Sequence, residues 1–130
     1  MLASFLRRLI PERFRPIGYL THLARARTGS TVVSGPFAGL KYGDVSQGSA
    51  YIPKLLGIYE RELIPQVAEI VSLHPKIIVD IGAAEGYYAV GLARLLPEAR
   101  VIGFEMEFSG RATLSTMAAR GAVCPKRRSN

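Results

Sequence analysis

The chain has little of several features that would point to particular protein classes. It has one cysteine, Cys124, and no tryptophan, so an intramolecular disulfide is excluded and a reducing compartment fits. Its two histidines, His22 and His74, are isolated and lack the spacing of a metal site. No apolar run approaches the ~18–20 residues that cross a bilayer. We therefore expect a cytoplasmic protein with no bound metal and no transmembrane segment.

The positive charge of the chain is concentrated at its two ends. Residues 1–30 contain six arginines and one glutamate, whereas residues 31–105 contain six basic and eight acidic side chains. Residues 106–130 again contain five basic side chains and one acidic one. A basic protein suggests nucleic-acid binding, but the central body is mildly acidic, so we expect no nucleic-acid partner. The alternative is a degenerate, non-enzymatic domain whose basic ends bind RNA or acidic partners.

One stretch of the chain, residues 76–107, predicts a strand–helix–strand unit. It reads K-I-I-V-D-I-G-A-A-E-G-Y-Y-A-V-G-L-A-R-L-L-P-E-A-R-V-I-G-F-E-M-E. The β-branched run 77–81 indicates a strand buried on both faces. A helical pattern follows over 87–96 and stops at Pro97, and 100–105 predicts a second strand. This pattern is typical of a βαβ unit with its ligand site at the carboxyl ends of the strands.

The sequence before this unit predicts a helical and hairpin-like extension. Apolar residues at helical spacing in positions 2–9 indicate an amphipathic helix. The fragments 31–33 and 40–42 flank S-G-P-F-A-G and predict a hairpin or two short edge strands, followed by a loop over 43–48. An apolar stripe over 52–71 indicates a helix, and Pro65 predicts a kink near Ile64 or two short helices.

The sequence after this unit predicts one more helix and a loose tail. Ser109 can cap a helix that Gly121 ends. The last residues, C-P-K-R-R-S-N, show no periodicity and indicate disorder. We accordingly expect a basic helical extension over 1–30, an α/β domain over 31–123 and a disordered tail over 124–130.

The glycine turn after the first predicted strand fits neither common phosphate-binding pattern. Read from Gly82, a G-x-G-x-x-G fingerprint would need glycines where Ala84 and Tyr87 stand, and no lysine provides a phosphate loop. The carboxylates of Asp80 and Glu85 would also oppose a diphosphate. A ligand that is uncharged or cationic here is tolerated, and S-adenosylmethionine is such a ligand.

The segment V-D-I-G-A-A-E-G resembles the first motif of class I S-adenosylmethionine-dependent methyltransferases. Asp80, Gly82, Ala84 and Gly86 occupy the motif positions in order, with alanine in place of the usual middle glycine. The resemblance implies that these four residues bind S-adenosylmethionine and that Glu105, at the end of the second strand, holds the ribose hydroxyls. It also implies a Rossmann-like parallel sheet, covering roughly residues 31–123.

The resemblance covers only the first core strands of such an enzyme. The later strands of the family, which carry the adenine contact and the usual catalytic residues, have no counterpart after Val123. We therefore expect an incomplete Rossmann-like sheet and the cofactor-binding N-terminal half of a truncated methyltransferase. No catalytic residue and no methyl-acceptor substrate can be named. The alternative within the same architecture is a fragment of an NAD(P)-type nucleotide-binding oxidoreductase.

Overall fold

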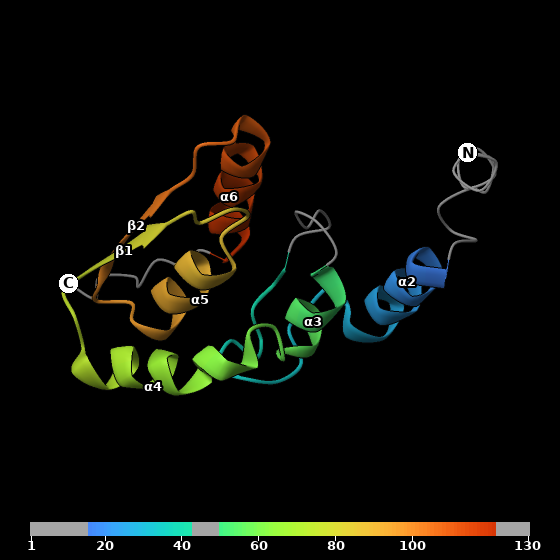
Figure 1. Cartoon of the computed structure of the whole chain (residues 1–130), viewed down its shortest axis with the longest axis horizontal. Helices are drawn as coiled ribbons and strands as arrows, with labels where there is room; N and C mark the ends of the chain where they lie inside the picture. Colours follow the sequence, from blue (N-terminus) through green and yellow to red (C-terminus); the bar gives the residue numbers. More distant parts are fainter. Residues whose placement is uncertain (1–15, 43–49, 122–130) are drawn as a thin grey trace, which may run out of the picture.

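A computed structural model describes residues 16–42 and 50–121, which form an α/β structure with a two-stranded parallel sheet at one side (Figure 1). The elements in chain order are α2 (Pro16–Thr28), α3 (Tyr51–Leu56), the 3₁₀ helix η2 (Arg61–Leu63), α4 (Ile64–Leu73), β1 (Ile77–Ile81), α5 (Tyr87–Leu95), β2 (Arg100–Phe104) and α6 (Phe108–Gly121). The α/β class expected from the sequence is confirmed. The expected division into an extension, a domain and a tail stays a prediction.

The predicted βαβ unit is present. Strand β1 pairs with β2 in parallel, with Ile77 opposite Arg100 and Ile81 opposite Phe104. Helix α5 connects the two strands, and its last backbone bond runs from Leu96 N–H to the Leu92 carbonyl, immediately before Pro97. Proline removes the next donor, which is why the helix ends where the sequence predicts. Strand β2 ends one residue earlier than expected, so Glu105 follows the strand.

The sheet is covered on one face only, within the described residues. On that face, a side chain added at Gly103 would meet Ala83, Ala89 and Leu114, so α5 and α6 pack directly against the strands. Every second residue of β1 points the other way: Ile77, Val79 and Ile81 are exposed. The expectation of a strand buried on both faces is therefore wrong. A β-branched run is compatible with such burial but does not provide the second covering layer.

The segments before the βαβ unit contribute to the main cluster of buried apolar residues, together with α5. Residues 31–41 fold back on themselves: Thr31 and Lys41 form an antiparallel bridge, and Val32 exchanges backbone bonds with Gly39 and Leu40. The hairpin-like arrangement is thus confirmed, in a form with a single bridge. The buried apolar residues of this cluster are Val32, Phe37, Leu40, Tyr42, Tyr51, Leu55, Val67, Tyr87, Val90, Leu92 and Met117. Side chains from the hairpin, α3 and α5 therefore share one core.

The helical stripe over 52–71 is divided into two short helices, as one of the two predicted alternatives has it, and the second begins at Ile64. Helix α3 ends at Gly57 in the left-handed conformation, and α4 begins at Ile64 with Pro65 in its first turn. Proline is tolerated there because that N–H has no partner within the helix. The prediction that Ser109 caps the last helix is wrong by two residues. The Glu107 carbonyl accepts the first helical bond, from Arg111 N–H, and places Ser109 inside α6.

Several sequence predictions fall outside the described residues: the helix over 2–9, the loop over 43–48 and the disordered tail over 124–130. A search of the part of the chain that the structure describes finds no helix both long and apolar enough to cross a bilayer.

Candidate functional site

The turn between β1 and α5, residues 82–86 (turn 82–86), is built from left-handed backbone. Gly82 and Gly86 have φ of +82° and +96°, and Ala84 has φ of +46°. Glycine accepts these angles at little cost, whereas a residue with a Cβ pays ~1–2 kcal/mol. The amides of Gly82 and Ala83 both donate to the Phe104 carbonyl, at 2.8 and 2.9 Å. The turn is therefore fastened to the end of β2 and presents its backbone at the carboxyl edge of the sheet.

Glu105 joins this turn to the start of α6. Its Oε2 accepts a hydrogen bond from Ala84 N–H at 2.8 Å, and its Oε1 accepts one from Glu107 N–H at 2.7 Å. These two amide donors, that of Glu107 first, hold the pKa of Glu105 below its ordinary value. Each carboxylate oxygen keeps a further lone pair for a hydroxyl donor. Glu105 thus lies beside the turn 82–86, where the sequence places it.

Two neighbours of Glu105 were not identified from the sequence. A Cβ added at Gly110 would lie 2.7 Å from Cγ of Glu105, so the absence of a side chain there makes room for the carboxylate. Arg111 Nη1 donates to the carbonyls of Glu105 and Met106 at 3.1 and 2.5 Å. A small residue in the first turn of the following helix is the only sequence signal for this arrangement.

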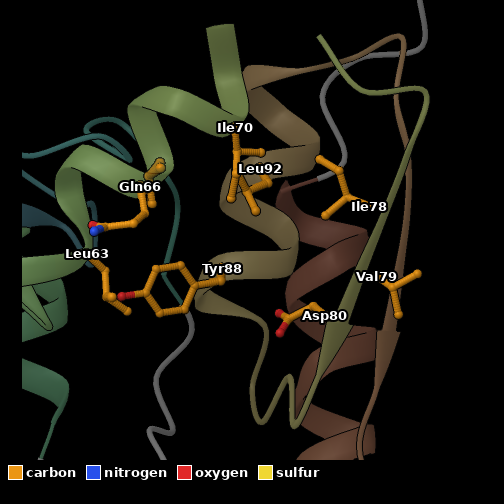
Figure 2. A pocket seen from close by; sticks show the side chains of 9 residues that line it. Leu63, Gln66, Ile70, Ile78, Val79, Asp80, Tyr88 and Leu92 are labelled. Atoms are coloured by element: carbon orange, nitrogen blue, oxygen red, sulfur yellow. The ribbon is translucent and has the colours of Figure 1, made fainter. Parts of the chain in front are cut away.

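Asp80 borders an apolar groove between α4, β1 and α5. This groove has a volume of about 220 Å³, and Figure 2 shows Asp80 and Val79 pointing to opposite sides of β1. The residues that line it are Leu63, Gln66, Val67, Ile70, Ile78, Val79, Asp80, Tyr88 and Leu92. Oδ2 of Asp80 is buried and has no hydrogen-bond partner among the described residues. Burial raises the pKa of Asp80 above its ordinary value, and a backbone amide at Ala89 offsets part of this effect.

Glu85 points into the protein rather than toward a ligand. It is 1% exposed, and its Oε1 pairs with the ammonium group of Lys54 and accepts a hydrogen bond from the hydroxyl of Tyr42. Burial alone would raise the pKa of Glu85, but Lys54 and Tyr42 outweigh it and hold this pKa below its ordinary value. The carboxylate of Glu85 is therefore buried and ionised, and the ammonium group of Lys54 balances its charge. We call Tyr42, Lys54 and Glu85 the Glu85 cluster.

The inward position of Glu85 corrects an expectation drawn from the sequence. Glu85 was expected to oppose a diphosphate together with Asp80, but its charge is compensated internally by Lys54. Tyr87, at the position of the third glycine of the fingerprint, has its ring buried against Phe37 and Tyr59, with ring-centroid distances of 5.2 and 5.8 Å. Two features still disfavour a phosphate ligand: the carboxylate of Asp80, and the residues Ala84 and Tyr87 at positions where the dinucleotide fingerprint has glycine.

The tyrosines near the site are poor proton acceptors at neutral pH. Burial raises the pKa of Tyr87 to about 12. A hydrogen bond to Glu60 and burial raise the pKa of Tyr59 to about 12, and burial followed by Glu60 raises that of Tyr88. All three remain neutral phenols. A search of the described residues for groups of three or more histidine, cysteine, aspartate or glutamate side chains that could hold a metal ion finds none.

The structure thus brings Gly82, Ala84, Gly86 and Glu105 together at one edge of the sheet. The side chain of Asp80, in β1, instead borders the groove toward α4. Of the positions proposed from the sequence, Glu105 and Ala84 are in direct contact. Comparison of the chain with protein-family models, with curated proteins and with solved structures finds no match in any of the three.

Proposed function

We propose that this chain binds S-adenosylmethionine at the carboxyl ends of β1 and β2, as the cofactor-binding part of a class I methyltransferase with a Rossmann-like sheet. One observation carries the proposal. The Glu105 carboxylate is held against the backbone of the turn 82–86, by the bond from Ala84 N–H. A carboxylate at the end of the second strand, beside a glycine turn, is the arrangement with which βαβ folds bind the ribose of a nucleotide-like ligand.

The donor set of the site fits this cofactor. Both oxygens of Glu105 keep acceptor capacity for the two ribose hydroxyls. No atom lies within 4 Å of the position that a Cβ would take at Gly82, so the backbone there is open to close approach. The carboxylate of Asp80 has an oxygen without a partner among the described residues, which suits an ammonium or hydroxyl donor.

The residues of this chain contribute binding and orientation to the proposed reaction. When bound, S-adenosylmethionine supplies an electrophilic methyl group on a sulfonium. Asp80 and Glu105 place negative charge beside that cation, and the turn 82–86 fixes the position of the cofactor relative to the strand ends. Orientation of this kind is a principal source of rate enhancement in group transfer. Tyr59 and Tyr87 do not act as general bases here, because their raised pKa values, about 12, keep them protonated at neutral pH.

An NAD(P)-type ligand is the competing candidate, and one observation favours keeping it. Since Lys54 neutralises Glu85, the start of α5 carries less negative charge than the sequence suggests. A dinucleotide would place its diphosphate there, at the helix N-terminus. Glu105 suits the ribose of either ligand. The carboxylate of Asp80 nevertheless disfavours a diphosphate, and Ala84 and Tyr87 replace two glycines of the fingerprint.

Calorimetric titration with S-adenosylhomocysteine tests the proposal. Glu105→Ala should weaken binding by about tenfold or more, because it removes the acceptor of charge-assisted hydrogen bonds. Glu107→Ala is the matched control: its carboxylate is two residues away and exposed, and its contact with Glu105 is through the backbone. Titration with NAD distinguishes the competing candidate. Absence of heat from the folded wild-type chain with S-adenosylhomocysteine would contradict the proposed function.

A further inference from the structure

The Glu85 cluster places three polar groups inside an apolar core, which is unusual. Lysine and glutamate are almost never fully buried unless paired, and here Lys54 is 6% and Glu85 1% exposed. The Lys54 ammonium also lies over the ring of Tyr59, at 4.5 Å from its centroid, and near that of Tyr87, at 5.8 Å. A buried ion pair is weak evidence for stability, because desolvation offsets the attraction. Its retention here calls for another explanation.

The position of Glu85 in the chain suggests what the cluster does. Glu85 lies between Ala84 and Gly86, which both adopt left-handed backbone. The N–H of Ala84 that meets Glu105 belongs to the peptide before Ala84, and the left-handed backbone of Ala84 joins that peptide to Glu85. A Glu85 side chain anchored inside the protein therefore restricts the backbone at Ala84, on which the direction of this N–H depends. The left-handed conformation is energetically unfavourable for Ala84, because this residue carries a Cβ. Without the cluster, the strain at Ala84 favours relaxation of the turn to a backbone conformation in which Ala84 N–H no longer contacts Glu105.

The cluster also links segments far apart in sequence. Tyr42 ends the hairpin-like segment and Lys54 belongs to α3, so 43 and 31 residues separate them from Glu85. We propose that Tyr42 and Lys54 are positioning residues that, acting through Glu85, preset the turn 82–86 for its ligand. The inference rests on the proposed function for the identity of that ligand. It assigns to the segment before the βαβ unit a role in the affinity of the site.

Tyr42→Phe is the most selective test, because it removes one hydroxyl and keeps the ring. Tyr51→Phe is its matched control: Tyr51 is also buried, its ring is 5.5 Å from that of Tyr42, and its hydroxyl bonds to Arg25 and Ser30 instead of Glu85. The two variants should lose comparable stability. Only Tyr42→Phe should loosen the turn 82–86.

Two measurements separate positioning from general destabilisation. Tyr42→Phe should weaken S-adenosylhomocysteine binding by about tenfold, the factor expected for losing one hydrogen bond to a charged group, and should speed hydrogen exchange at Ala84. Tyr51→Phe should change neither. Lys54→Arg, which keeps the charge, should retain more affinity than Lys54→Met, and both are checked for folding by circular dichroism.

The outcomes distinguish this inference from the proposed function. If Tyr42→Phe and Tyr51→Phe have the same affinity and the same exchange rate at Ala84, the positioning role is overturned. If the wild-type chain does not bind S-adenosylhomocysteine, the proposed function falls. Hydrogen exchange in the free protein then decides whether the cluster holds the turn.

Discussion

Replacing Gly86 by alanine should destabilise the fold through two separable effects. Gly86 has φ of +96°, where a Cβ costs ~1–2 kcal/mol. Its Cβ would also lie 2.5 Å from Cδ1 of Leu114 and 3.1 Å from Cγ2 of Val90. Overpacking of a core contact costs typically ~1–3 kcal/mol. We therefore expect the free energy of unfolding to fall by ~2–5 kcal/mol in Gly86→Ala.

Gly82 provides the control for this prediction. Its φ of +82° imposes a similar backbone cost, but no atom lies within 4 Å of the Cβ position. Gly82→Ala should therefore lose only ~1–2 kcal/mol. Urea unfolding followed by circular dichroism measures both, and the midpoint should shift about 1 M further for Gly86→Ala than for Gly82→Ala. Equal shifts would refute the inference that α6 packs closely on the turn through Leu114.

Three further predictions concern the carboxylates and the uncovered sheet face. Burial raises the pKa of Asp80, so the stability it contributes is present below its ordinary value of 3.8 and is lost as pH rises through the folded value. Asp80→Asn should thus raise the urea midpoint at pH 7 and not at pH 3, while weakening cofactor binding. The lowered pKa of Glu85 has the opposite effect: the stability that Glu85 contributes is present above its ordinary pKa of 4.5 and is lost as pH falls through the lower folded value. The free energy of unfolding of Glu85→Gln should therefore change less between pH 5 and pH 3 than that of the wild type. Val79→Thr, on the exposed face, should change the free energy of unfolding by less than ~0.5 kcal/mol, and a larger loss would show that this face is covered.

The strand–helix–strand unit could be predicted because its signals are local. The β-branched run of β1, the left-handed turn that needs glycine and the helix stop at Pro97 each depend on neighbouring residues in the chain. The same is true of the placement of Glu105 after β2, since parallel strands bring their carboxyl ends to one edge. Its contact with Ala84 follows from that geometry and is seen in the structure.

The features that the sequence did not reveal depend on contacts between distant segments. Nothing near Glu85 indicates that its partners are Tyr42 and Lys54, so the sequence alone predicts a carboxylate that faces the ligand. The exposure of every second residue in β1 depends on which faces the helices cover, and a run of β-branched residues does not encode that. The space that Gly110 leaves for Glu105 likewise arises only when α6 packs beside the strand end.

Amide chemical-shift mapping of the ¹⁵N-labelled chain during titration with S-adenosylhomocysteine tests the central claim most directly. Binding at the proposed site should give saturable shifts that are largest at Gly82, Ala84, Gly86 and Glu105, and small shifts in the hairpin-like residues 31–41. Saturable shifts confined to the groove between α4 and β1, or none with the chain folded, would contradict a cofactor site at the carboxyl ends of β1 and β2.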